Sequence, residues 1–586
     1  MLSLSKLYPE GELASPPLAQ PLRKPSLVPS VEDRDDDCAP FASSASGLSC
    51  SSAETIRRKR ESYNLSGSIF LVTSSGKTLN LPVPSDSPAD PLNWGRRKTS
   101  GAIIAVALYS TVSLPVVQAA SLVYHGILTE FDEQDTHPWT VETLVTAPTL
   151  FMGFGALLWV PLSLGMGRRP VFLIAALMML LATIGAGYAT NFYQLLTCFC
   201  FLGLGEGLSL TLALLMMIDM TFIHQRPKAV ALLWSLAGFA GTSSLAITPY
   251  LSSHGDDWRR YYHYWSIPMA VSFVVVLLLF PETYFKRPTV AFDGLILLQS
   301  ATEKLTVYKD DEADSDIYRD LPDLPTGRRA GFHGLRDRLG LSRSPFASWT
   351  AVSRCYYQMA FCVVNPLIFW VFIASSVNFA GMLFIGATYA QILRSSPYSL
   401  PSVLIMNVNI CSGVGALFAF PFSGILIGNI LNHLARRNRG TREAEHFLVR
   451  YILPVITGAL STVLYGFAVQ RKLHFAFYYL AYGLNGFSWT TLSISNTMWV
   501  TEAFPRWAAP AISVLAGGCY ILSFTMSFAI VPWVQAHGYK LVGVELAVLQ
   551  VVAGLVAVPI AFKGKNARQA IHGKWAHERA GALRPL

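Results

Sequence analysis

The sequence predicts an all-α membrane protein whose twelve transmembrane helices form two six-helix bundles. First, 52% of the 586 residues are hydrophobic and only 14% are charged, whereas a soluble domain carries about 25% charged residues. Second, the chain contains repeated apolar runs near the length of about 20 residues that a helix needs to cross the hydrocarbon core. Third, these runs fall into two groups of six, which is typical of the internal duplication in transporters with parallel repeats.

The first segment, 1–98, is rich in serine, proline and charged residues, with a mostly acidic run at 32–37 and a basic run at 57–60. A segment of this composition cannot bury enough apolar area to offset the entropy that ordering it would cost. We therefore expect a disordered cytoplasmic N-terminal tail.

The first bundle is expected at 99–285. Its six apolar runs lie near 101–124, 143–165, 170–189, 193–217, 228–251 and 264–281. The charged segment 286–355 contains no run long enough to span, so we expect a cytoplasmic linker loop there. The second bundle is expected at 356–563. Its six runs lie near 362–392, 402–430, 449–469, 475–500, 509–532 and 542–562. The basic residues of 564–586 indicate a cytoplasmic tail.

The distribution of Lys and Arg in the short loops predicts the orientation. If both termini are cytoplasmic, the inside loops contain Arg168, Arg169 and Arg226, whereas the first outside loop, 125–142, has no Lys or Arg. We therefore expect a multi-pass protein of the plasma membrane with both termini in the cytoplasm.

Several function classes are disfavoured by the motifs that the sequence lacks. The eight cysteines form no CxxC pair and lie mostly in apolar runs, so we expect no metal site and no disulfide framework. The chain has no GxxxxGK[ST], HExxH or GxSxG motif, which argues against an ATP-driven pump and against a hydrolase. The net charge of +9 comes from residues that punctuate the apolar runs, so the expected partner is the bilayer and no nucleic acid. We expect a channel or a secondary transporter, not an enzyme, with no cofactor.

One acidic residue, Glu206, lies well inside an apolar run, about 20 Å from its end at 1.5 Å per residue. A charge at that depth costs about 2.5–3.5 kcal/mol, so the side chain should face the bundle interior. We expect Glu206 to carry protons or to anchor a cationic substrate. The alternative is a protonated or hydrogen-bonded helix contact among the neighbouring glycines.

The tenth run is unusually polar for a transmembrane helix. Four of its residues recur on one helical face: Asn485, Trp489, Ser493 and Asn496. In lipid such a face turns inward. Asn378, Asn407 and Gln118, from three other runs, are expected to line the same cavity. Aromatic rings and amides suit an organic ligand of mixed polarity, and the alternative is ordinary hydrogen bonding between helices.

Several motifs resemble the major facilitator superfamily, and in particular its fungal drug:proton antiporter-like members with twelve spans. Gly167-Arg168-Arg169 matches the end of that family's GxxxDRxGRR loop, although Leu164 stands at its acidic position. Asp219 to Arg226 resembles the DxxFxHxR connection after the fourth span, and Pro281-Glu282 follows the pattern after the sixth. The resemblance covers about residues 90–563.

The resemblance implies alternating access by two bundles that rock against each other. It implies an efflux transporter of a xenobiotic or secondary metabolite, driven by a proton gradient and acting as a monomer. It also implies a gating role for six residues: Gly167, Arg168, Arg169, Asp219, Arg226 and Glu282. Two alternatives stay open, namely a proton-coupled importer of a cation or polyamine, and a non-transporting membrane sensor or scaffold with the same fold.

Overall fold

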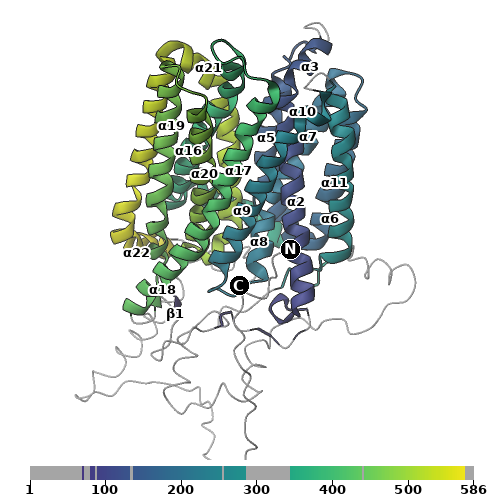
Figure 1. Cartoon of the computed structure of the whole chain (residues 1–586). Helices are drawn as coiled ribbons and strands as arrows, with labels where there is room; N and C mark the ends of the chain where they lie inside the picture. Colours follow the sequence, from purple (N-terminus) through teal and green to yellow (C-terminus); the bar gives the residue numbers. More distant parts are fainter. Residues whose placement is uncertain are drawn as a thin grey trace, which may run out of the picture. The chain divides into compact units, whose positions relative to one another are not determined.

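Helices cross the molecule side by side in the computed structural model of this chain (Figure 1). The structure describes residues 69–70, 80–82, 84–85, 87, 89–131, 136–253, 257–285, 343–438 and 441–574. Most of the expected tail at 1–98 and of the expected linker at 286–355 lies outside the described residues. All described residues belong to one compact unit.

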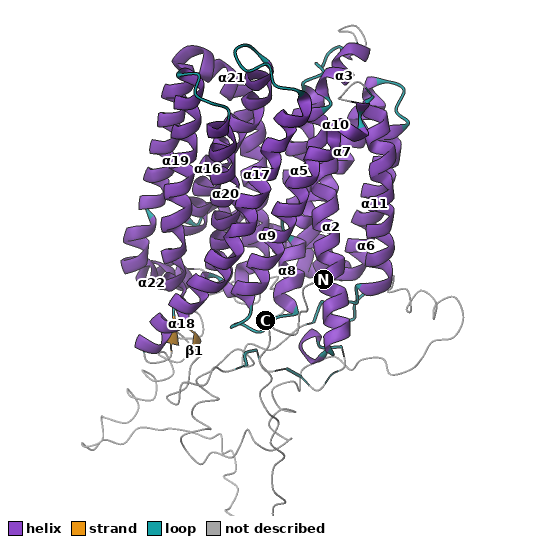
Figure 2. Ribbon diagram, viewed as in Figure 1, coloured by secondary structure: helices purple, strands orange, loops and turns teal. Residues whose placement is uncertain are grey.

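The first half consists of six crossings, which Figure 2 shows as almost wholly helical. They are α2 (Arg96–Leu122), α5 (Thr143–Met166), α6 (Arg168–Gly187), α7 (Phe192–Ser209) continued by α8 (Leu212–Asp219), α9 (Arg226–Ser244) continued by η3 (Leu245–Ile247) and α10 (Thr248–Leu251), and α11 (Trp258–Leu279). Two short elements flank them, α3 (Tyr124–Glu130) and η2 (Pro91–Asn93). We call the end at which α2 begins the lower end, as drawn in Figure 1.

The second half begins with α15 (Trp349–Val364), which leads into the seventh crossing. The crossings are α16 (Pro366–Arg394), α17 (Ser402–Ala419) continued by a π-helical stretch η7 (Phe420–Leu426) and α18 (Ile427–Arg437), α19 (Ile452–Gln470) preceded by η8 (Ala444–Tyr451), α20 (Ala476–Ala503), and the two parts of α21 (Ala508–Leu555), which η9 (Pro505–Trp507) precedes and α22 (Ala557–Lys574) extends. The short strands β1 (Ile69–Phe70) and β2 (Thr441–Arg442) pair antiparallel.

The number of crossings follows from length and composition. Within the described residues, 10 helices are long and apolar enough to cross a membrane, and the last of them, Ala508–Arg568, covers 61 residues. Its backbone breaks at Gly538, where φ is +76°, so it crosses twice. Helix α20 is also long enough, at 28 residues, but its hydroxyl and amide side chains keep it out of that apolar group. Together these helices make twelve crossings, and the predicted fold class is confirmed.

Polar side chains set several helix starts. Asn191 accepts a hydrogen bond from the backbone N–H of Gln194 at 2.9 Å at the start of α7. Asn365 does the same for Leu367 at 3.0 Å, directly before the proline that begins α16. Such caps satisfy backbone donors that a helix leaves unpaired in its first turn.

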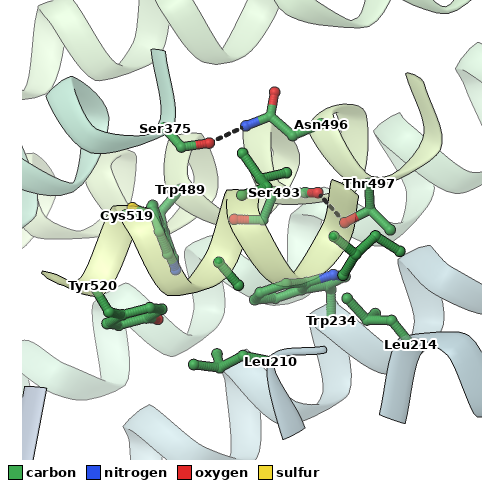
Figure 3. A pocket seen from close by; sticks show the side chains of 13 residues that line it. Leu210, Leu214, Trp234, Ser375, Trp489, Ser493, Asn496, Thr497, Cys519 and Tyr520 are labelled. Atoms are coloured by element: carbon green, nitrogen blue, oxygen red, sulfur yellow. Dashed lines mark hydrogen bonds between the residues drawn. The ribbon is translucent and has the colours of Figure 1, made fainter. Parts of the chain in front are cut away.

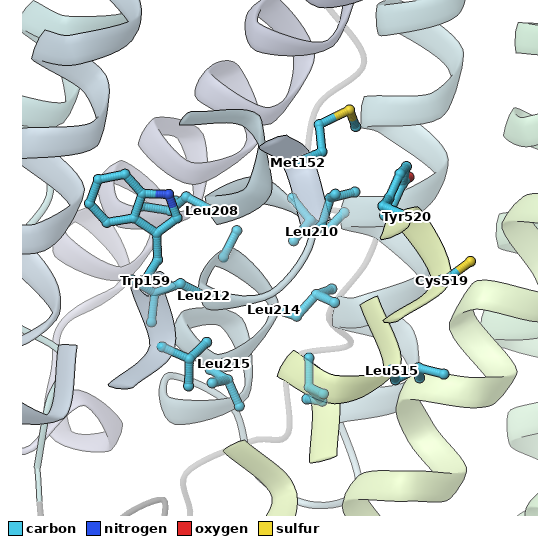
Figure 4. Close-up of a cluster of buried hydrophobic side chains, with 14 of the residues drawn as sticks. Met152, Trp159, Leu208, Leu210, Leu212, Leu214, Leu215, Leu515, Cys519 and Tyr520 are labelled. Carbon is cyan, nitrogen blue, oxygen red and sulfur yellow. The ribbon is translucent and has the colours of Figure 1, made fainter. Parts of the chain in front are cut away.

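The two halves meet along two helix pairs, α5 with α21 and α9 with α17. Small residues allow this approach: a Cβ on Gly153 would lie 2.9 Å from the carbonyl oxygen of Gly517, and one on Gly413 would lie 2.8 Å from that of Phe239. Since lipid supplies no hydrophobic force between helices, close backbone approach of this kind increases the van der Waals packing that helps to hold them together. Figure 4 shows a further apolar cluster, in which Leu210 and Leu214 of the first half lie toward Tyr520 and Leu515 of α21, with Leu208 and Leu212 beside Trp159 behind them.

Candidate functional site

A cavity of about 40 Å³ lies at the junction of the two halves (Figure 3). It is lined by Leu210, Leu214, Trp234, Ser375, Trp489, Ser493, Asn496, Thr497, Ile512, Leu515, Ala516, Cys519 and Tyr520. The first half contributes the break between α7 and α8 together with α9, and the second half contributes α16, α20 and α21. We call this space the central cavity.

One part of the cavity wall is aromatic. The ring of Phe379 meets the ring of Trp489 at 4.9 Å and that of Tyr520 at 5.2 Å, both edge to face. Trp234 of α9 lies beside Leu214 on another part of the wall (Figure 3). Edge-to-face packing holds large rings in fixed orientations, so the wall presents flat apolar surfaces of defined direction.

Another part of the wall is polar but uncharged. The Asn496 amide donates to the Ser375 hydroxyl and accepts from the Tyr451 hydroxyl. The Thr497 hydroxyl donates to the backbone oxygen of Ser493 at 2.8 Å. None of the thirteen residues that line the cavity carries a charge.

Three of the four residues predicted on the face of the tenth span line the central cavity, namely Trp489, Ser493 and Asn496. Asn485 does not: it is fully buried within the second half. It lies one turn, about 6 Å, further from Asn496 along α20 than Trp489 does, and the cavity ends at Trp489. Periodicity identifies a face, but it does not show where along that face a cavity stops.

The other predicted lining residues lie elsewhere. Asn378 donates to the Ser488 hydroxyl at 2.8 Å and lines a separate space of about 10 Å³ inside the second half, together with Gln550. Asn407 and Gln118 are half-buried and line neither space. Sequence reasoning missed Trp234 and Tyr520, because a single aromatic residue within an apolar run gives no periodic signal.

Glu206 lies directly behind the cavity wall. Its side chain is 2% exposed, and its Oε1 accepts a hydrogen bond from the Ser209 hydroxyl at 2.5 Å. It is about one turn from Leu210, which lines the cavity. The Tyr109 hydroxyl of α2 donates to the backbone oxygen of the neighbouring Gly205 at 2.9 Å, and Tyr520 of α21 lines the cavity together with Leu210. The carboxyl is therefore buried close to the junction of the two halves.

A polar network ties the lower end of the first half together. The Arg168 guanidinium donates through Nε to Asp219 at 2.8 Å and through one terminal nitrogen to the Ser163 hydroxyl at 3.0 Å. Its side chain is fully buried and that of Asp219 is 4% exposed. Arg226, the first residue of α9, is also buried. The ion pair joins α6 to α8.

Glu282, just beyond α11, caps the start of α6. Its Oε1 accepts from the backbone N–H of Arg168 at 2.9 Å, and its Oε2 accepts from that of Arg169 at 3.2 Å. A carboxylate is favourable there because of the partial positive charge at a helix N-terminus. Burial raises the pKa of the Glu282 carboxyl, and these backbone donors oppose that shift. Gly167 turns the chain with φ at +109°, and a Cβ there would lie 2.5 Å from Glu282 Oε2.

The second half carries an equivalent network at the same end. Arg442, just before its third crossing, pairs with Glu502 at the end of its fourth at 3.3 Å. Arg568, at the end of the last helix, pairs with Glu445 at 2.7 Å, and both side chains are nearly inaccessible. The segment that follows the sixth helix thus supplies a carboxylate in the first half, and the last helix supplies a guanidinium in the second. Each of these ion pairs joins segments of one half, so the arrangement can stiffen each half as a unit.

Comparisons with known proteins agree with this architecture. The family model described as Major Facilitator Superfamily matches residues 99–527. An uncharacterized MFS-type transporter of Schizosaccharomyces pombe is 22% identical, over 88% of this chain and 92% of its own length. The efflux pump radE of Floropilus chiversii is 23% identical, over 73% of each chain.

Solved structures show the same fold. The proton:xylose symporter XylE with a bound bromodeoxyglucose has a TM-score of 0.55 at 12% identity and matches 80% of this chain and 97% of its own. A POT family transporter bound to a conjugated peptide has a TM-score of 0.51 at 13% identity, over 82% of this chain and 99% of its own. At these identities the likeness extends to the fold alone.

Proposed function

The chain belongs to the major facilitator superfamily, and from this premise we propose that it exports a small organic molecule, a xenobiotic or secondary metabolite, by alternating access. It is a multi-pass membrane transporter and not an enzyme. The resemblance drawn from its sequence motifs is confirmed at the level of the family. The substrate, the direction of transport and the coupling ion belong to the proposal.

The observation that carries the proposal is the position of the central cavity between the halves. At about 40 Å³ it holds roughly three water molecules, since each needs about 10–15 Å³ on this measure. An organic ligand needs a much larger pocket, so the cavity must open to receive one. Because both halves form its wall, rocking one half against the other both enlarges the cavity and connects it to one side of the membrane.

Export is supported by the Floropilus relative, which is named an efflux pump. The MFS-type transporter penM of Penicillium rubens matches at a similar identity of 22%, and its name gives no direction of transport. We place the protein in the plasma membrane as a monomer with both termini in the cytoplasm. The rigid units that move would be 99–285 and 356–563, joined through 286–355.

We further propose that Glu206 couples transport to protons. Its carboxyl is buried close to the junction of the halves and has only serine hydroxyls, those of Ser209 and Ser113, as hydrogen-bonding neighbours among the described residues. Ionisation in such a site is costly unless water or a donor reaches the group. Opening of the central cavity would admit water toward the carboxyl, so its proton could leave in one state and return in the other.

The test is flux into vesicles that contain the purified full chain, across a panel of labelled organic compounds, with and without an imposed pH gradient. We expect uptake by inside-out vesicles that depends on the gradient. Glu206→Gln should abolish the dependence of flux on the pH gradient. The control is Glu545→Gln, because the Glu545 carboxyl contacts His537 away from the cavity, and this variant should retain the dependence. Flux in the opposite direction would indicate an importer. A folded protein without flux for any compound would favour the sensor or scaffold.

A further inference from the structure

The central cavity contains hydrogen-bond donors that nothing in the described part of the chain uses. The indole nitrogen of Trp234 is buried without a partner. Among the described residues, no hydrogen bond involves the indole nitrogen of Trp489 or the hydroxyl of Ser493. The hydrogen bond from Thr497 to Ser493 uses the backbone oxygen of Ser493 and not its hydroxyl. An indole N–H can only donate. The wall therefore has at least two N–H groups and one hydroxyl available to a ligand.

The acceptors of the same wall are largely occupied. The Asn496 carbonyl oxygen accepts from Tyr451, and the Ser375 hydroxyl oxygen accepts from Asn496. The Thr497 hydroxyl is turned onto the backbone of its own helix. The free Ser493 hydroxyl can both donate and accept, whereas the two free indole N–H groups can only donate. The free groups thus favour a ligand that accepts hydrogen bonds over one that only donates them.

The apolar part of the wall favours flat rings. Trp489 and Tyr520 are held by Phe379 through edge-to-face contacts, and Trp234 presents a second indole from the other half (Figure 3). A planar ligand between surfaces of this kind gains stacking as well as burial.

The absence of charged side chains in the wall favours a neutral ligand. The thirteen lining side chains carry no charge, and the carboxyl of Glu206 lies behind them, where it accepts a hydrogen bond from Ser209. An ammonium group only donates, so it would add donors to a wall that already has unused ones. An anion would find no Lys or Arg among the lining residues. A cation would find no carboxylate among the lining residues, only hydroxyl oxygens and cation–π attraction to the rings.

We propose that the substrate is a neutral, planar aromatic molecule with carbonyl-type acceptors on its edge, such as a quinone, an aromatic ketone or a lactone, held by the N–H groups of Trp234 and Trp489. This inference rests on the proposed function, because it names the substrate class of the same cavity. It disfavours the cation or polyamine importer that the sequence leaves open.

The test uses three tricyclic probes of nearly equal shape. The purified full chain in lipid nanodiscs is titrated with 9,10-anthraquinone, with anthracene, which lacks the carbonyls, and with 9-aminoacridinium, which carries a positive charge. We expect anthraquinone to bind at least about tenfold more tightly than anthracene, since a site with unused buried donors discriminates against a ligand that cannot accept. It should also bind more tightly than the acridinium.

Variants show which groups are responsible. Trp234→Phe keeps a ring and removes the N–H, so anthraquinone affinity should fall by about fivefold, while anthracene affinity stays nearly unchanged. The matched control is Trp533→Phe, whose indole donates to Glu545 outside the cavity, and it should change neither. Equal affinity for anthraquinone and anthracene, or preference for the acridinium, would overturn the inference.

The two proposals fail in different ways. If anthraquinone binds as expected and the vesicles show no flux of any compound, the transport proposal fails and the assignment of the cavity stands. If the vesicles transport other compounds while anthraquinone neither binds nor competes, the transport proposal stands and the substrate class is wrong.

Discussion

Removal of the Asp219 carboxylate tests whether the polar network at the lower end of the first half is a structural element. Asp219→Ala leaves the Arg168 guanidinium fully buried without the carboxylate that it contacts directly. The Ser163 hydroxyl at 3.0 Å and the Tyr284 ring at 5.4 Å remain, and Glu282 acts on it only at longer range. Leaving one charge of a buried pair uncompensated costs about 3–5 kcal/mol. Removing an exposed pair costs at most about 1 kcal/mol. The variant should therefore be among the most destabilising single changes in the first half.

The assay is unfolding of the purified full chain by denaturant in micelles, with Arg168→Met and Asp219→Leu combined as the decisive control. Replacing both charges by apolar groups leaves neither member of the pair buried alone, so the double variant should recover most of the lost free energy of unfolding. If the double variant is as unstable as Asp219→Ala, or if Asp219→Ala costs no more than an exposed pair does, the buried pair has no such role. A gating role would appear separately, as a change in flux per folded molecule.

Two further predictions concern the ends of the same half. Gly167→Ala should cost about 1–3 kcal/mol in the same unfolding assay, because it strains a residue with φ at +109° and brings a Cβ to 2.5 Å from Glu282; equal stability would contradict the close contact. At the other end, hydrogen bonds from Arg259 lower the pKa of Glu130 below its ordinary value of 4.5. A carboxyl with a lowered pKa in the folded state stabilises above that ordinary value and loses its contribution as the pH falls through the lowered one. Thermal unfolding of wild type and Glu130→Gln should therefore differ at neutral pH, by at most about 1 kcal/mol, and converge in acid.

The fold was predictable because lipid imposes length and composition on each helix. Runs of about 20 apolar residues match the length that a helix needs to cross the hydrocarbon core, and eleven of the crossings are long and apolar. The predicted ends differ where local contacts extend a helix. The sixth crossing begins at Trp258, six residues before the apolar run, because Asp257 caps it and Trp258 is buried. The last helix continues through α22 to Lys574, beyond the predicted boundary at 563, and its Arg568 pairs with Glu445.

The site was predictable only in part. Periodicity shows which face of a helix points inward, but it does not show which part of that face lines a cavity. The polarity of the tenth span correctly indicates an interior face, and Trp489, Ser493 and Asn496 line one cavity. Asn378 belongs to hydrogen bonding inside the second half instead. The partner wall, Trp234 with Tyr520, depends on which helices of the two halves face each other, and that pairing is a property of the tertiary structure.

The contacts within each half differ in kind from those between the halves, and this difference explains why the molecule can move as two units. Within each half, buried ion pairs at 2.8 Å between Arg168 and Asp219 and at 2.7 Å between Arg568 and Glu445 fix helices at specific distances. Between the halves, the contacts along α5 with α21 and along α9 with α17 involve small residues such as Gly517. Van der Waals contacts of this kind can be exchanged for similar ones after a small slide, whereas a buried ion pair cannot be stretched without exposing a charge to a low dielectric. Deformation should therefore concentrate at the junction of the halves, which is where the central cavity lies.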